Sequence, residues 1–191
     1  MMFVERCSSC DRPARGLCTA CRAQLAPPPV LDLSPELDHV HGVFSYVDDG
    51  AHLVQKLKFR NRRRALGPLA DALGASLPTG FDLLVPVPAS PTHRRERGYD
   101  LPELLGRALS RRLDVPIRQA LRRTDAGTQH RRTRVQRLQN DGFVAVRSVA
   151  PTVLLIDDVA TTGATARSCA RALRAAGADT VELCVLAVTP G

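Results

Sequence analysis

The amino-acid sequence predicts an α/β fold, in which a mostly parallel sheet lies between helices and follows a small cysteine-rich module. Three observations support this prediction. Short strand patterns alternate with helical patterns along the chain, which favours parallel β–α–β units. The segment Thr152–Ile156 is continuously apolar, as is typical of a central parallel strand buried on both faces. Four of the six cysteines form two CxxC pairs near the N-terminus.

Length and composition agree with one domain and a small module. The chain has 191 residues, of which 44% are hydrophobic, so there is enough apolar material for one core. We expect a cysteine module with a proline-rich connection at 1–38 and the α/β domain at 39–191. No apolar run reaches the ~18 residues of a membrane span. The first ten residues lack the pattern of a signal peptide, so the expected location is cytoplasmic.

The expected elements follow from apolar spacing and from turn residues. Strands are expected at 39–47, 82–87, 116–122, 143–146, 152–156 and 180–188. Helices are expected at 51–60, 64–77, 101–113 and 164–176. Asp48–Gly50 is expected to form a turn, and the polar segment 123–141 a mobile loop. Cys169 and Cys184 lie in apolar patterns and are predicted core residues.

The four N-terminal cysteines are candidate metal ligands. Cys7 and Cys10 form one CxxC pair, and Cys18 and Cys21 form the other. Two such pairs complete a tetrahedral four-thiolate zinc site, and metal binding would stabilise a module too small to have a core. Disulfides and a redox CxxC are the alternatives, but persistent disulfides are rare in the cytosol. The sequence therefore favours structural Zn²⁺, with no open position for catalysis.

The chain is strongly basic. Its formal net charge is +8, and all basic residues except Lys56 and Lys58 are arginines. Basic blocks at 54–64 and 92–137 would attract phosphate groups, although charged runs are also common as solvated faces. Aromatic residues make up only 4% of the chain, so any single-stranded DNA would be held by its phosphates rather than by base stacking. The candidate DNA-binding residues are Lys56, Lys58, Arg60, Arg62, Arg63 and Arg64.

The segment Val153–Thr165 carries the strongest signal for a binding site. A buried strand is predicted to end in Asp157 and Asp158, and a small, hydroxyl-rich turn then opens a helix. Ligands of open α/β sheets bind at the carboxyl ends of the strands, and a helix N-terminus favours a phosphate there. The two acids would repel a phosphate, so they suit ribose hydroxyls or a metal held by the ligand. An N-cap alone would explain one acid or one threonine, and no P-loop or Rossmann motif is present.

This segment resembles the phosphoribosyl pyrophosphate (PRPP) motif of type I phosphoribosyltransferases, and the whole chain resembles the competence protein F (ComF) family. Further matching pieces are the cysteine module and the segments Leu57–Phe59, Val85–Pro88 and Arg97–Tyr99, followed by Gln129, Arg137, Asn140 and Phe143. The resemblance implies a type I phosphoribosyltransferase fold. Its mostly parallel sheet has five strands flanked by helices, with a hood made by N-terminal residues.

The resemblance also implies roles for individual residues. Asp157 and Asp158 would bind the ribose hydroxyls of PRPP, and Mg²⁺ would accompany the ligand. The 5′-phosphate would be bound by Val159, Ala160, Thr161, Thr162, Gly163, Ala164 and Thr165. The pyrophosphate loop would comprise Ala89, Ser90, Arg94, Arg95 and Arg97. The mobile loop that closes over the ligand would contribute Gln129, Arg134 and Arg137.

Two departures from the family pattern bear on function. Asp100 and Leu101 stand where the family often has Asn and Gln, and Thr161 stands where purine-salvage relatives have a candidate catalytic Asp. A purine acceptor is therefore not supported. The resemblance implies a role in natural transformation, with phosphoribosyl transfer to an unknown acceptor and release of pyrophosphate. The alternative is a non-catalytic factor that senses PRPP or binds single-stranded DNA and acts with competence-machinery proteins.

Overall fold

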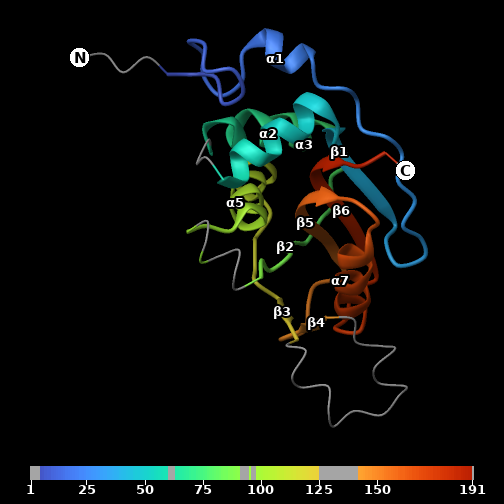
Figure 1. The fold of residues 1–191 in the computed structure, drawn as a ribbon. Helices are drawn as coiled ribbons and strands as arrows, with labels where there is room; N and C mark the ends of the chain where they lie inside the picture. Colours follow the sequence, from blue (N-terminus) through green and yellow to red (C-terminus); the bar gives the residue numbers. More distant parts are fainter. Residues whose placement is uncertain (1–4, 60–62, 91–94, 96–97, 125–141, 191) are drawn as a thin grey trace.

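The computed structural model describes residues 5–59, 63–90, 95, 98–124 and 142–190 (Figure 1). The helices are α1 (Thr19–Ala23), α2 (Asp48–Phe59), η1 (Arg63–Ala65, a 3-10 helix), α3 (Leu66–Ser76), α5 (Leu101–Leu113) and α7 (Ala164–Arg174). The strands are β1 (His39–Ser45), β2 (Leu83–Pro86), β3 (Leu121–Arg123), β4 (Phe143–Ala145), β5 (Thr152–Ala160) and β6 (Thr180–Val188). No helix in this part of the chain has the length and apolar character needed to cross a membrane.

A parallel sheet forms the centre of the molecule. Its strand order is β1-β6-β5-β2, and all three neighbouring pairs are parallel. Strands β3 and β4 form a separate antiparallel pair. The predicted parallel α/β fold is thus confirmed, but the described sheet has four strands rather than five. Ile117 makes only a single parallel bridge to Leu84, at the position where the fifth strand was expected.

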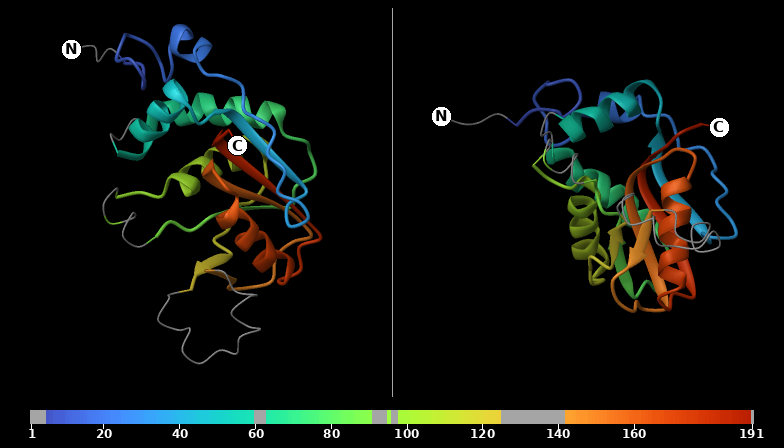
Figure 2. Two further views of the ribbon diagram at one scale, coloured as in Figure 1. Left: turned by 45° about the vertical axis from the view of Figure 1, so that its right-hand side comes forward. Right: turned by 60° about the horizontal axis from the view of Figure 1, so that its bottom comes forward.

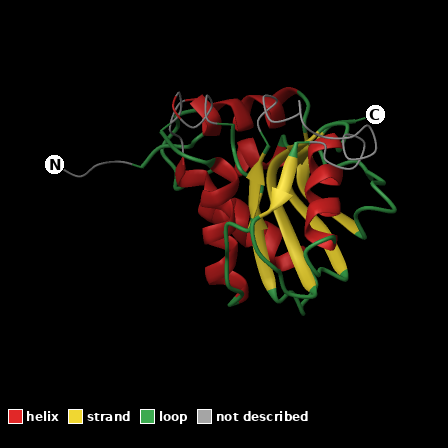
Figure 3. Cartoon of the chain, turned by 90° about the horizontal axis from the view of Figure 1, so that it is seen from below, coloured by secondary structure: helices red, strands yellow, loops and turns green. Residues whose placement is uncertain are grey.

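Helices cover both faces of the sheet, as Figure 3 shows. On one face, Leu154 and Ile156 pack with leucines of α2, α3 and α5. On the other face, Val153 and Leu155 pack with α7 and with Leu33 of the N-terminal connection. Alternate residues of β5 therefore enter two different cores, which explains the continuous apolar run. Cys169 and Cys184 are fully buried in these cores, as predicted, and burial raises the pKa of both thiols.

Helix α2 begins earlier than the sequence suggested. The expected turn at Asp48–Gly50 is wrong, because these residues form the first turn of the helix. Asp48 and Asp49 place negative charge at the helix N-terminus, where it is stabilising. Gly50 is required there, since a Cβ would lie 2.2 Å from the carbonyl oxygen of Ser45.

The cysteine module lies over α2 and α3 in every view (Figures 1 and 2). Cys7 and Leu17 are buried in the same apolar cluster as the leucines of these helices. The Lys56 ammonium on α2 donates a hydrogen bond to the carbonyl of Ser9. Gly16 has a φ of +66° and packs so closely on α3 that a Cβ would lie 2.8 Å from Pro68.

The connection between the module and β1 is held against α7 by arginines. Arg171 donates to the Glu36 carboxylate at 3.1 Å, and Arg174 donates to the Asp38 carboxylate at 2.6 Å. Leu33 is buried against Gly163, at the residue that precedes α7. The connection therefore contacts both α7 and the segment that contains the candidate phosphate loop.

Candidate functional site

The acidic pair lies within β5 rather than after it. The strand was expected to end at Ile156, but it continues to Ala160 because β6 pairs with it over this whole length, with Asp157 opposite Val185. Successive strand residues point to opposite faces. Asp157 therefore shares the α7 face with Leu155, and Asp158 shares the α2 face with Ile156.

Asp157 is in an environment that disfavours its ionised form. Burial raises the pKa of its carboxyl group to about 8, and the adjacent charge of Asp158 acts in the same direction. Asp157 accepts a hydrogen bond from the Asp158 backbone N–H at 2.8 Å, and Lys58 is close enough to favour the charged form, but neither outweighs burial. A carboxyl group with this pKa can donate or accept a hydrogen bond near neutral pH.

Asp158 forms an ion pair with Lys58 of α2. The Nζ and Oδ1 atoms are 2.6 Å apart, and the two side chains are only 17% and 13% exposed. Lys58 was predicted on a DNA-binding surface, but the structure places it against the acidic pair. A sequence signal for this position existed: Lys58 follows Val54 by four residues, so both lie on the buried face of α2.

The predicted 5′-phosphate loop surrounds a small cavity. Gly163 has a φ of +74° and precedes α7, and the Ala164 N–H donates to the Thr162 hydroxyl at 3.4 Å. The cavity has a volume of about 70 Å³. It is lined by Asp157, Val159, Ala160, Thr161, Thr162, Gly163, Ala164, Thr165, Ala166 and Leu183. The structure thus brings Asp157 and the whole predicted loop together, with Asp158 turned toward α2.

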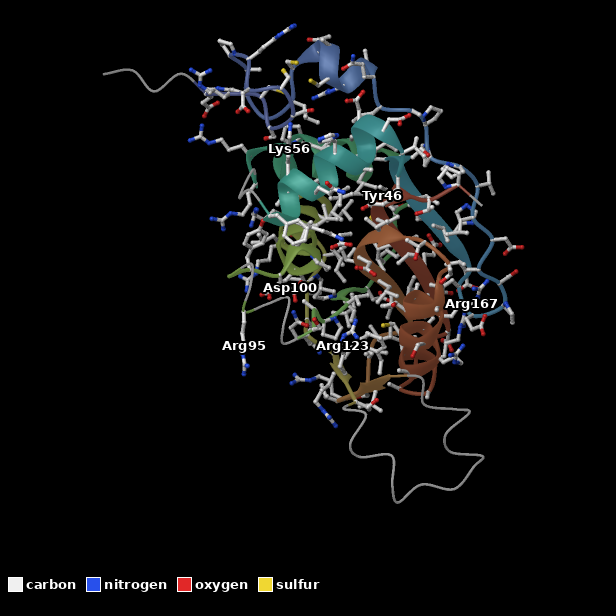
Figure 4. All side chains as sticks on the ribbon, viewed as in Figure 1. Tyr46, Lys56, Arg95, Asp100, Arg123 and Arg167 are labelled. Carbon is white, nitrogen blue, oxygen red and sulfur yellow. The ribbon has the colours of Figure 1, made fainter. Side chains whose placement is uncertain are left out.

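The predicted pyrophosphate loop follows β2. The backbone N–H of Ala89 donates to the Asp100 carboxylate at 3.1 Å, and the other oxygen of Asp100 accepts from the N–H of Glu103 at 3.3 Å. Asp100 is only 5% exposed, so it both caps α5 and holds the start of the loop. Ser90 is half-buried, whereas Arg95 is exposed and points away from the sheet (Figure 4).

Several predicted site residues lie outside the described part of the chain. These are Arg60, Arg62, Arg94, Arg97, Gln129, Arg134 and Arg137.

Arg123 is a site residue that the sequence analysis did not single out. It lies on β3, and its Nε donates to the carbonyl of Pro88 at 3.1 Å, directly before the pyrophosphate loop. Its guanidinium group lies over the Phe143 ring, 4.7 Å from the centroid. The antiparallel pairing of β3 and β4 brings Arg123 and Phe143 together, and nothing in the local sequence indicated that register.

The remaining residues of the predicted DNA-binding block are spread over different environments. Lys56 is bonded to the cysteine module, as described above. Arg63 stacks on the Tyr99 ring at 5.2 Å, and the Tyr99 hydroxyl donates to the carbonyl of Leu57. Arg64 is exposed. The described residues of this block therefore do not form one continuous basic surface.

The four N-terminal cysteines form one cluster of free thiols. Their sulfur atoms all lie within 4.8 Å of one another, and the Sγ atoms of Cys10 and Cys18 are 3.7 Å apart. A disulfide would require about 2.05 Å, whereas a tetrahedral ion with sulfur ligands at ~2.3 Å separates them by about 3.8 Å. Burial opposes ionisation of Cys7, but backbone N–H groups of Cys18, Cys10 and Ser9 outweigh it and lower the pKa of Cys7 to about 6. This cluster can hold a metal such as zinc.

Fold and site together define a class of protein. A parallel sheet flanked by helices carries an acidic pair near the carboxyl end of its central strand, and a hydroxyl-rich loop and a helix follow. This is the phosphoribosyltransferase type of α/β fold, here with an N-terminal four-cysteine cluster. No protein-family model matches the chain.

Sequence comparison identifies the family. The chain is 30% identical to the DNA utilization protein YhgH of Escherichia coli O6:H1, over 96% of this chain and 90% of that protein. It is 28% identical to competence protein F of Haemophilus influenzae, over 97% of each chain. Among solved structures, the purine phosphoribosyltransferase of Pyrococcus horikoshii is 19% identical and covers 66% of this chain and 73% of its own, with a TM-score of 0.40. The chain belongs to the competence protein F family.

Proposed function

We propose that this protein binds PRPP at the carboxyl end of β5. The observation that carries the proposal is the cavity shared by Asp157 and the loop Val159–Ala166. Hydroxyl groups and a glycine surround this cavity at the start of α7, which suits the 5′-phosphate of the ligand. Asp157 and Asp158 lie on β5 directly before this loop, where carboxylates suit the ribose hydroxyls.

The proposed transfer reaction is displacement of pyrophosphate at C1 of the ribose. The bond from C1 to the pyrophosphate oxygen breaks, and a bond from C1 to an acceptor nucleophile forms. Charge on the departing pyrophosphate would be offset by Arg123, whose Nε donates to the carbonyl of Pro88 directly before the loop after β2, and by arginines of that loop. Mg²⁺, held by ligand oxygens and water, would neutralise further charge. PRPP sensing without transfer is the alternative use of the same site.

Calorimetry of PRPP binding tests the site. The double variant Asp157→Asn with Asp158→Asn should bind PRPP at least tenfold more weakly, because each charge-assisted hydrogen bond contributes about 1.5–3 kcal/mol. Asp71→Asn is the matched control, since the Asp71 side chain is 70% exposed on α3. Equal affinity in the wild type and the double variant would show that the site is assigned wrongly.

We propose a second function, in DNA uptake during natural transformation. One relative is named for competence and another for DNA utilization, and the chain carries a net charge of +8. Single-stranded DNA would be bound through its phosphates, with competence-machinery proteins as further partners. A cytoplasmic location, where thiols stay reduced, is part of this proposal.

We also propose that the metal of the four-cysteine cluster is structural zinc. The spacing of the sulfur atoms supports a tetrahedral site with Cys7, Cys10, Cys18 and Cys21 as ligands. Such a closed site stabilises a fold and leaves no position for a substrate. The proposed role of the zinc is to hold the module against α2 and α3.

A further inference from the structure

A second, larger cavity lies between α7 and the β3–β4 pair and adjoins the candidate PRPP site, with which it shares Ala164 and Thr165. Its volume of about 460 Å³ falls in the range of small-ligand pockets. It is lined by Arg123, Gly142, Phe143, Ala164, Thr165, Arg167 and Arg171, and we call it the arginine groove. Figure 4 labels two of these residues, Arg123 of β3 and Arg167 of α7, on the two sides of the α7 ribbon in that view.

The arginine groove has a strong excess of positive charge. Arg167 and Arg171 are four residues apart and therefore lie on the same face of α7, and Arg123 faces them from β3. Glu36 of the N-terminal connection lies 3.6 Å from Arg167 and 3.1 Å from Arg171 and helps to hold both in position. Arg167 also helps to lower the pKa of the Asp32 carboxyl group, so a second acid lies near it. The described lining of the cavity itself contains the three arginines and no acidic residue.

The chemistry of the groove favours phosphate over a nucleobase. Phe143 is only 4% exposed, and the guanidinium group of Arg123 covers its ring, so no aromatic face is open for stacking. Guanidinium groups match the oxygen geometry of phosphates and carry a permanent charge. The arginines would recognise a ligand through several consecutive phosphate groups, and they would not select among bases.

We propose that the arginine groove binds the phosphodiester backbone of single-stranded DNA. This inference rests on the DNA-uptake function proposed above and assigns a surface to it. The alternative surface, the block around 56–64, is weaker, because Lys56 and Lys58 are bonded to Ser9 and Asp158. The groove arginines are bonded too, to Glu36 and to the carbonyl of Pro88, but three of them from two elements line one cavity.

The test is a titration of the full, zinc-loaded chain into a labelled oligothymidylate without terminal phosphates, at several salt concentrations. Arg171→Gln should weaken binding about threefold to tenfold at low salt and reduce the salt slope by roughly 0.7, the value for one lost phosphate contact. Arg123→Gln is the second variant, on a different element, and should have the same effect. Arg174→Gln is the matched control, because Arg174 also lies on α7 and pairs with Asp38 but does not line the groove.

The expected result is a loss in both groove variants and no loss in Arg174→Gln. Wild-type affinity in both groove variants would overturn the proposal, as would an equal loss in Arg174→Gln. A wild-type chain that binds no DNA at low salt would overturn it as well. PRPP calorimetry separates these outcomes from a failure of the PRPP site. Arg171→Gln removes no residue of the proposed PRPP site and should keep the wild-type PRPP affinity, whereas Asp157→Asn with Asp158→Asn removes no arginine from the groove.

Discussion

Asp157 has an unusual position for an acidic side chain, because it lies on a central strand and faces a helix. Burial raises the pKa of its carboxyl group from 3.8 to about 8. Near neutral pH the side chain is therefore a neutral hydrogen-bonding group in the ligand-free protein. PRPP with its cation would change the surrounding charge, so ligand binding and proton release by Asp157 are linked.

We predict that the contribution of Asp157 to the stability of the protein falls as the pH rises from about 4 to about 8. In this window the unfolded chain ionises Asp157, whereas the folded chain keeps the proton, so the contribution is complete below pH 4 and is lost by pH 8. One unit of pKa difference corresponds to about 1.4 kcal/mol, so the loss should exceed ~1 kcal/mol. Denaturant unfolding of wild type and Asp157→Asn at pH 5 and pH 8 measures it.

Asp157→Asn should be more stable than wild type at pH 8 and show a flatter pH dependence. Asp71→Asn, on an exposed carboxylate, should keep the wild-type pH dependence. If Asp157→Asn and wild type lose stability in parallel over this range, Asp157 is ionised in the folded protein, and its pKa is not raised by burial.

At single positions, the sequence indicated which residues belong to the candidate site better than it indicated the contacts that these residues make. The Asp157–Thr165 motif indicated a phosphate loop, and these residues do line one cavity with the exception of Asp158. The ion pair between Lys58 and Asp158 joins residues 100 positions apart, so no local pattern could reveal it. The same holds for Arg123 and Pro88, which meet only because β3 leaves the end of the sheet beside β2.

Among the elements, the loop before α7 is the most constrained. Gly163 adopts a φ of +74°, and a Cβ there would lie 2.3 Å from a methyl group of Leu33. The backbone conformation alone costs an L-residue about 1–2 kcal/mol. The N-terminal connection therefore fixes the position of the loop that begins the helix.

We predict that Gly163→Ala lowers the free energy of unfolding by more than about 1 kcal/mol. Adding Leu33→Ala removes the methyl group that the new Cβ would meet, so Gly163→Ala should cost less stability in the Leu33→Ala background than in the wild type. Thermal or denaturant unfolding measures both. Gly67→Ala is the control, because a Cβ at this helical position meets no atom within 4 Å and should stabilise α3 by roughly 0.5–1 kcal/mol. An unchanged free energy of unfolding in Gly163→Ala would mean that the loop adjusts to the added methyl group and is not constrained.

The sequence predicted most elements within a few residues, and it predicted Leu101–Leu113 and Thr180–Val188 with their observed bounds. Regular apolar spacing and clear end signals, such as the Asp100 cap, account for this success. The errors have tertiary causes. Strand β5 extends past Ile156 because β6 offers partners as far as Val188. The fifth strand is reduced to one bridge at Ile117, because the chain turns away to form β3.

At the scale of the whole molecule, the cysteine module and the α/β domain share a core. Cys7, Leu17 and Cys21 pack in one apolar cluster with α2 and α3. Helix α2 also supplies Lys58 to the acidic pair. Helix α2 therefore contacts both the cysteine module and the acidic pair, so a structural change in the module can shift Lys58 relative to Asp158.

We predict that removing the metal destabilises the whole chain and not only its first residues. Elemental analysis should find about one zinc per chain, and a strong chelator should lower the midpoint of thermal unfolding, because structural zinc contributes directly to folding. Cys7→Ser with Cys10→Ser should already show the lower midpoint and should not respond to chelator. Disulfides between the cysteines of the freshly purified protein, or a midpoint unchanged by chelator, would contradict this.

The order of strands has a consequence for how the protein is made. In chain order, β1 is the first strand of the described sheet and β6 is the last. The only partner of β1 in that sheet is β6. During synthesis the edge of β1 has no native partner in the described sheet until residues 180–188 have been made, so the nascent chain carries an open strand from residue 45 to residue 180. Such edges are prone to pairing with other chains. The interval between the synthesis of β1 and that of β6 is therefore the period in which this chain is most exposed to mispairing.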